Sequence, residues 1–151
     1  PGALIHPHQK KGEEKWQEVM VKEELKEEEV KKAIVFTAEE VETILGNIET
    51  LMRVSTPFLK HRYCIRDMAE QLGMPSYQLS AFINQNAGMN FNDFINKERI
   101  AYCIKLIDED QIDGLNLFGL SDKCGFSNRN TFRNAFKKFT GKTPSIFIKD
   151  N

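Results

Sequence analysis

The sequence predicts an all-helical fold: two helix-turn-helix subdomains joined by a long linker helix and preceded by a charged linker. Three observations support this fold class. Apolar residues recur every three or four positions over most of the chain after residue 37, as on one face of a helix. No run alternates apolar and polar residues well enough to indicate a strand. Two short predicted helices end at Gly73 and Gly125, and a second helix follows each within a few residues.

The composition is ordinary for a small globular protein. The 151 residues suffice for one domain or two very small ones, and 40% of them are hydrophobic while 28% are charged. No apolar run approaches the roughly 20 residues that span a membrane, and no signal-like segment is present. Three cysteines far apart in sequence indicate reduced thiols in a cytoplasmic protein. Because the chain starts with Pro1, we expect a fragment of a longer protein.

Residues 1–36 are expected to form a charged linker that is helical in part. Residues 1–12 show no periodicity and are interpreted as flexible. Residues 13–32 are rich in Glu and Lys, with opposite charges four positions apart, which is typical of a solvated helix or of a disordered linker. A connector helix that dimerises or relays a signal, with Trp16 as its anchor, is the alternative.

The helices of the remaining chain follow from caps, apolar spacing and stop signals. Thr37 and Glu40 form a capping box that opens a helix, and Pro57 ends this helix. A long helix over residues 92–107 separates the two halves. The shorter helices are predicted over residues 67–72, 76–85, 116–123, 127–139 and 145–149.

The glycine-linked helix pairs have a geometry suited to DNA. Glycine adopts the left-handed conformation at little cost, so two helices can cross steeply within a few residues. The outer face of the second helix can then enter a major groove, which has room for one helix. The net charge of the chain is −1, yet residues 121–149 contain seven Lys and Arg against one Asp. Such a basic stretch indicates a surface that faces a polyanion.

Short motifs in both halves resemble the DNA-binding domain of AraC/XylS-type bacterial transcription regulators, over about residues 56–149. In the first half the resemblance rests on Asp67–Met74, Leu79–Ser80, Gly88–Phe91 and Arg99–Ile100. In the second half, where it is strongest, it rests on Gly125–Ser127, Thr131–Phe132, Ala135–Lys138, Gly141 and Thr143–Ser145.

The resemblance implies a homeodomain-like DNA-binding domain over residues 37–151. Its first helix-turn-helix falls at about 64–86, the bridging helix at about 92–107 and the second helix-turn-helix at about 116–139. It implies sequence-specific binding to double-stranded DNA as the output domain of a regulator, with each recognition helix in a major groove. RNA polymerase is expected as a further partner. A second copy of the chain is also expected, as a homodimer formed through N-terminal or missing parts. No cofactor, metal, small-molecule site or enzymatic activity is expected.

The family's DNA contacts carry over onto both predicted recognition helices. On the first helix they fall on Tyr77, Ser80 and Ala81, with Asn84 and Gln85 near the DNA backbone. Ala81 offers only a methyl contact to thymine, and a half-buried residue at the helix start is the alternative for Tyr77. On the second helix they fall on Ser127, Asn128, Arg129, Asn130, Thr131, Arg133, Asn134 and Lys137. Arg matches guanine and Asn matches adenine through two hydrogen bonds each, whereas Lys138 and Lys142 suit phosphates.

Several residues depart from the family's pattern and bear on how rigidly each half is held. Cys64 and Asn116 stand where a Thr commonly caps the short helices, and Asn caps well whereas Cys does not. Pro75 removes a side-chain cap from the first recognition helix. Gly119 and Ser121 replace alanines, at up to about 1 kcal/mol each in helix propensity.

Other functions have weaker support in the sequence. An enzyme would need a cluster of catalytic residues, and His6 with His8 forms only a weak metal-binding pattern. RNA binding would need aromatic residues interleaved with basic ones. The main alternative is a helical protein-interaction module that binds through the charged residues 10–32. Salt-dependent binding to duplex DNA distinguishes a regulator from such a module.

Overall fold

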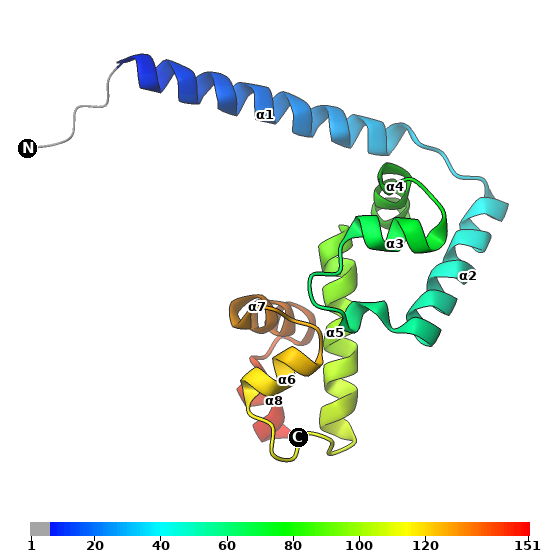
Figure 1. The fold of residues 1–151 in the computed structure, drawn as a ribbon, viewed down its shortest axis with the longest axis vertical. Coiled ribbons are helices and arrows are strands. Elements are labelled where there is room, and N and C mark those ends of the chain that lie inside the picture. The colour runs from blue at the N-terminus through cyan, green and yellow to red at the C-terminus, as the bar shows by residue number, and fades with distance from the viewer. Residues whose placement is uncertain (1–6) are drawn as a thin grey trace, which may run out of the picture. The chain divides into compact units, whose positions relative to one another are not determined.

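The computed structural model describes residues 7–151, except the side chains of residues 7–10 and 31. The chain divides into two compact units between Val35 and Phe36. The described residues form helices and no strand, which confirms the predicted all-helical fold (Figure 1).

The first unit is the helix α1 (Pro7–Ala33). Of the stretch predicted to be flexible, residues 7–12 are helical, and residues 1–6 lie outside the described part of the chain. An ion pair of the predicted spacing occurs on the helix, since Lys22 Nζ lies 3.7 Å from Glu18 Oε1, whereas the predicted partner Lys31 lies outside the described side chains. Trp16 is 72% exposed. The charged segment is therefore a solvated helix, one of the two forms that its composition left open.

The second unit begins with a capped helix, α2 (Ala38–Ser55). The backbone N–H of Glu40 donates to Thr37 Oγ1 at 3.1 Å, and the N–H of Thr37 donates to Glu40 Oε2 at 2.8 Å, which confirms the predicted capping box. Just before it, the Phe36 ring meets the Phe82 ring edge-on, with centroids 5.3 Å apart. The compact unit thus begins one residue before the boundary expected at residue 37.

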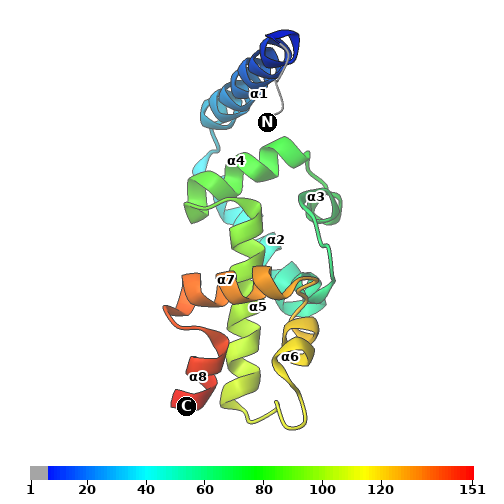
Figure 2. The ribbon, with the colours of Figure 1, turned by 90° about the vertical axis from the view of Figure 1, so that its left-hand side faces the viewer.

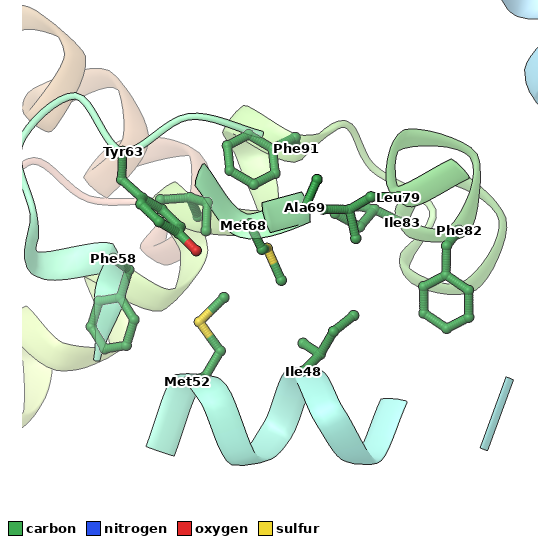
Figure 3. Packing of buried hydrophobic residues seen from close by; sticks show 11 residues of the cluster. Ile48, Met52, Phe58, Tyr63, Met68, Ala69, Leu79, Phe82, Ile83 and Phe91 are labelled. Atoms are coloured by element: carbon green, nitrogen blue, oxygen red, sulfur yellow. The ribbon is translucent and has the colours of Figure 1, made fainter. Parts of the chain in front are cut away.

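The first helix-turn-helix subdomain has its own buried core (Figure 3). Its elements are α2, the short 3-10 helix η1 (Pro57–Leu59), α3 (Ile65–Leu72), α4 (Ser76–Ala87) and the start of α5 (Phe91–Asp108). Figure 3 shows Ile48 and Met52 of α2 facing Met68 of α3. The buried residues are Ile48, Met52, Phe58, Tyr63, Met68, Ala69, Leu79, Phe82, Ile83, Phe91 and Ile95.

The second subdomain encloses a separate core. Its elements are the rest of α5, α6 (Leu117–Lys123), α7 (Arg129–Thr140) and α8 (Pro144–Asp150). The buried residues are Ile100, Cys103, Leu106, Ile107, Leu120, Cys124, Phe126, Phe132, Ala135 and Phe136.

The helix α5 belongs to both cores and is the predicted bridging helix. Its first turns contribute Phe91 and Ile95 to the first core, and its later turns contribute Ile100 and Cys103 to the second. Figure 2 shows α4 at the N-terminal end of α5 and α7 crossing it further down. The two predicted recognition helices therefore both pack against α5.

Candidate nucleic-acid interface

The turn of the first helix-turn-helix is made by Gly73. This residue has φ +67°, and the N–H of Met74 donates to the Ala69 carbonyl at 3.0 Å, which closes the end of α3. Pro75 stands at the cap position of α4 and forms no side-chain cap, as the sequence predicted. At the other end of α3, the Asp67 carboxylate accepts from the Cys64 N–H at 3.0 Å, and this bond holds the pKa of Asp67 below its usual value.

The turn of the second helix-turn-helix is made by Gly125, with φ +91°. A Cβ atom there would lie 2.5 Å from the Phe58 carbonyl oxygen, so the position admits only glycine without a shift of the backbone. The recognition helix α7 then starts at Arg129, two residues later than predicted. Asn116 caps α6 as expected, since its Oδ1 accepts from the Gly119 N–H at 2.8 Å.

The solvent-facing side of α7 carries the charged and amide side chains that the sequence singled out. Phe132, Ala135 and Phe136 turn the opposite side of the helix into the core. The exposed residues of the predicted set on this helix are Arg129, Asn130, Thr131, Arg133, Asn134, Lys137 and Lys138, with Ser127 and Asn128 exposed just before it. These side chains present donors for bases and charges for phosphates on one continuous surface.

Several members of the predicted set near α7 have internal hydrogen-bond or ion-pair partners. Asn128 Oδ1 accepts from the N–H groups of Asn130 and Thr131 at 2.7 and 3.2 Å, so it acts as the cap of α7. Lys138 Nζ lies 2.8 Å from Asp93 Oδ2, and Lys142 Nζ lies 2.9 Å from Asp150 Oδ2. Such exposed ion pairs contribute only about 0–1 kcal/mol to the stability of the fold. Both lysines can therefore exchange a carboxylate for a phosphate, at a small cost.

The outer face of α4 is uncharged. Tyr77 is 58% exposed, which excludes the alternative of a half-buried residue at the helix start. Ser80 is partly exposed, and Asn84 and Gln85 are exposed. Asn84 Nδ2 donates to the Ser80 carbonyl at 2.8 Å, which ties it to its own helix.

Ala81 does not belong to this face. Its exposure is 0%, because it lies on the side of α4 that packs into the protein beside Phe82. Its methyl group is covered and cannot reach a thymine methyl. The predicted contact by Ala81 is therefore wrong.

Arg99 of α5, which the sequence offered only as a motif residue, joins the two subdomains. It is 8% exposed, and burial lowers its pKa. Its Nε donates to the Phe58 carbonyl at 2.6 Å and its guanidinium donates to the Lys60 carbonyl at 3.1 Å. The same guanidinium lies 5.4 Å from the centroid of the Phe126 ring, in the second turn. The place of Arg99 in the family motif was the only signal in the sequence, because its partners at Phe58, Lys60 and Phe126 meet it only in the folded protein.

A second link between the subdomains lies at the surface. His61 Nε2 is 3.0 Å from the Asp122 carbonyl oxygen and 3.3 Å from Asp122 Oδ1. His61 precedes α3, whereas Asp122 lies in α6. The Lys138–Asp93 pair likewise joins α7 to the start of α5. The relative orientation of the recognition helices is thus held by several long-range contacts.

A groove of about 630 Å³ borders the exposed face of α7. It lies between α6, α7 and α8, and its lining includes Phe118, Arg129 and Arg133. The Arg129 guanidinium lies over the Phe118 ring, with Cζ 5.0 Å from the ring centroid. The groove is therefore continuous with the candidate DNA-binding surface.

Other kinds of site have little basis in the described part of the chain. No group of three or more His, Cys, Asp or Glu residues is placed to hold a metal ion among the described residues, and His6 with the side chain of His8 lies outside them. A hydrogen bond to Cys124 and burial raise the pKa of Cys103, so this thiol stays protonated. No described helix is both long and apolar enough to cross a membrane.

Comparison with known proteins identifies related sequences. Residues 68–150, more than half of the chain, match a family described as "Helix-turn-helix domain". The HTH-type transcriptional activator RhaR of Escherichia coli strain K12 is 26% identical over 106 residues, covering 69% of this chain and 35% of the relative. RhaR of Shigella flexneri serotype 5b gives the same values. The chain thus spans about a third of the length of these relatives.

Solved structures show the same fold. The C-terminal domain of AraT, a response regulator from Geobacillus stearothermophilus, superposes with a TM-score of 0.57 at 21% identity, covering 68% of this chain and 83% of that one. The C-terminal domain of the two-component response regulator yesN from Fusobacterium nucleatum gives 0.55 at 22% identity, covering 68% and 98%. The helix-turn-helix family matched over residues 68–150 is one of DNA-binding regulators and not of enzymes. The family match over residues 68–150 shows that the chain belongs to the AraC-type helix-turn-helix family of transcription regulators, and the two glycine turns and the basic face of α7 agree with it.

Proposed function

We propose that residues 36–151 bind double-stranded DNA sequence-specifically, with α4 and α7 in major grooves, as the output domain of a bacterial transcription regulator. The observation that carries this proposal is the exposed face of α7, where two arginines, two asparagines and Lys137 lie outside the core of a helix-turn-helix. Membership of a DNA-binding family supports it.

The side chains of α7 divide by chemistry into base readers and phosphate contacts. Arg129 and Arg133 each match the O6 and N7 of a guanine, and Asn130 and Asn134 match the edge of an adenine. Lys137 makes no ion pair with the described residues and is the first candidate for a phosphate. Lys138 and Lys142 also bind phosphates, after each exchanges its carboxylate partner for a phosphate. Ser127, Asn128 and Thr131, at the start of the helix, contact the DNA backbone.

The uncharged helix α4 binds DNA through neutral side chains. Tyr77 and Ser80 read base edges through a ring and two hydroxyl groups. Asn84 and Gln85 contact the DNA backbone. These contacts depend on shape and hydrogen bonds, so they add affinity with little dependence on salt.

We also propose two protein partners. The exposed apolar residues of α1, Trp16 and Met20 among them, support homodimerisation through this helix. RNA polymerase is the second protein partner, as expected of a transcription regulator, and the place of action is the cytoplasm. Deleting residues 1–35 tests the role of α1: a lower affinity for duplexes with two binding sites is expected, and unchanged affinity would exclude dimerisation through it.

Selection from a random duplex library, followed by footprinting of the winning sequence, tests the central proposal. We expect a protected region in two patches, one for each recognition helix, and affinity well above that for a random duplex at the same salt concentration. A protein that binds no duplex DNA at low salt would overturn the proposal. Binding of a protein through residues 10–32 without DNA affinity would instead support the interaction module.

A further inference from the structure

Phe118 of α6 is an aromatic residue that belongs to neither core. It is 54% exposed, and its ring lies under the Arg129 guanidinium, with Cζ 5.0 Å from the ring centroid. Phe118 also lines the groove beside α7. The ring and the cation come from different helices of the second helix-turn-helix, so their contact depends on the turn between them.

The contact leaves the hydrogen-bonding edge of Arg129 free. A guanidinium stacked on a ring uses its flat face, whereas its five N–H donors point outward in its own plane. No hydrogen bond or ion pair of Arg129 occurs within the described residues. Arg99 shows the contrast, since its donors are used by the carbonyls of Phe58 and Lys60. Arg129 is therefore held in place and still able to bind a ligand.

The backbone of Arg129 is also fixed. It is the first residue of α7, and Asn128 caps this helix through the N–H groups of the next two residues. Arg133, one turn later on the same face, has no aromatic partner among the described residues. The two arginines of the interface thus differ in how far their side chains are ordered before a ligand binds.

We propose that Phe118 is a positioning residue that orients Arg129 for a guanine in the major groove and so sets base preference at that position. The inference rests on the proposed DNA-binding function. Ordering a long side chain before binding removes part of the entropy that is otherwise lost in the complex. The strength of an exposed cation–π contact limits this ordering, so the gain in affinity is at most roughly two- to fivefold.

The test uses Phe118→Ala, Phe118→Leu and Phe118→Tyr, each alone and with Arg129→Ala or Arg133→Ala, in fluorescence anisotropy with the selected duplex. We expect Phe118→Ala and Phe118→Leu to bind roughly two- to fivefold more weakly. Phe118→Tyr keeps the ring and should bind like the wild type. The loss should vanish in the Arg129→Ala background and persist unchanged in the Arg133→Ala background. A parallel series of duplexes with each guanine replaced should show reduced discrimination at one position.

Leu117→Ala is the matched control, because Leu117 is the neighbouring exposed apolar residue of α6 and lines the same groove. It should leave affinity and base preference unchanged. The inference is overturned if Phe118→Ala weakens binding equally with and without Arg129, or if Leu117→Ala has the same effect. If the wild-type chain has no affinity for any duplex, the proposed function is overturned as well. If the wild type binds DNA but the affinity losses of Phe118→Ala and Arg129→Ala add up in the double variant, only the role of Phe118 is overturned.

Discussion

At position 125 both space and backbone conformation demand glycine. A Cβ atom would lie 2.5 Å from the Phe58 carbonyl oxygen, and φ is +91°. We expect Gly125→Ala to lower the free energy of unfolding by about 2–4 kcal/mol, because backbone strain and overpacking add. Urea denaturation measures the loss. Gly141→Ala is the control, since φ is +78° there but nothing lies within 4 Å of the added carbon. It should cost only about 1–2 kcal/mol of strain, and equal losses would refute the steric argument.

The two arginines of α7 are the residues on which base discrimination depends most. We expect Arg129→Ala or Arg133→Ala to weaken binding to the selected duplex by about 1–3 kcal/mol for each lost pair of hydrogen bonds to guanine. At least one variant should bind altered duplexes with less discrimination. Competition with random duplex at fixed salt measures this. If both variants lose the same affinity for selected and random DNA, the arginines contact only phosphates.

At the scale of elements, the recognition helices differ in charge, and salt dependence should separate them. The helix α4 contains no charged side chain, whereas α7 contains two arginines and two lysines. The slope of log affinity against log salt changes by about 0.9 for each phosphate contact. Replacing Lys137, Lys138 and Lys142 with Gln should flatten it by up to about 3 units. Replacing Tyr77, Ser80 and Gln85 with Ala should lower affinity at every salt concentration and leave the slope nearly unchanged.

The ion pairs of the two lysines refine this expectation. Lys137→Gln alone should flatten the slope by about 0.9. Asp93→Asn removes the carboxylate that holds Lys138 and should raise the affinity for random duplex at low salt. The proposed difference between the two halves is wrong if the triple variant of α4 flattens the slope as much as the triple lysine variant does.

The start of α3 should respond to acid through Asp67. Its carboxylate accepts the Cys64 N–H, which lowers its pKa in the folded state. A depressed pKa means that the ionised group stabilises the fold above the unfolded pKa of about 3.9, and that this stability is lost as pH falls through the folded value. Asp67→Asn should lower the melting temperature slightly at pH 7, and the difference should close in acid. A difference that stays constant down to pH 2 would contradict the capping role.

At the scale of the whole second unit, Arg99 couples the two subdomains. Arg99→Met keeps an unbranched side chain but leaves the Phe58 and Lys60 carbonyls without their donor. We expect the free energy of unfolding to fall by about 1–3 kcal/mol, the cost of leaving the buried Phe58 carbonyl unpaired, because the Lys60 carbonyl also accepts the Tyr63 N–H at 3.4 Å. We also expect the variant to tolerate duplexes in which half a turn is inserted between the two protected patches, which the wild type should bind poorly.

The measurement compares affinities for both duplexes at a temperature where circular dichroism shows the variant folded. Arg66→Met, an exposed arginine of the same subdomain, is the control and should retain the wild-type spacing preference. If Arg99→Met loses stability but discriminates spacing as the wild type does, α5 alone holds the recognition helices in place.

Local signals in the sequence predicted the helices and most of the candidate face. Apolar spacing, the Thr37 capping box and the glycine stops are signals within a few residues of each other, and helices depend on such local signals. The basic stretch 121–149 and the family motifs pointed to α7, and its polar residues are exposed as predicted. The start of α7 was predicted two residues too early, because both Ser127 and Asn128 have capping side chains and only the folded backbone shows that Asn128 is the cap.

Tertiary structure decided which of these residues are available to a ligand. Ala81 is buried and Lys138 is paired with Asp93, 45 residues away in sequence, so neither state follows from helix spacing. Arg99 meets the Phe58 carbonyl across 41 residues, and Phe118 meets Arg129 across a turn. These contacts depend on how two separate cores pack against α5. Spacing within a helix determines which residues share a face, but only the packing of one helix on another determines whether that face is covered, paired or open.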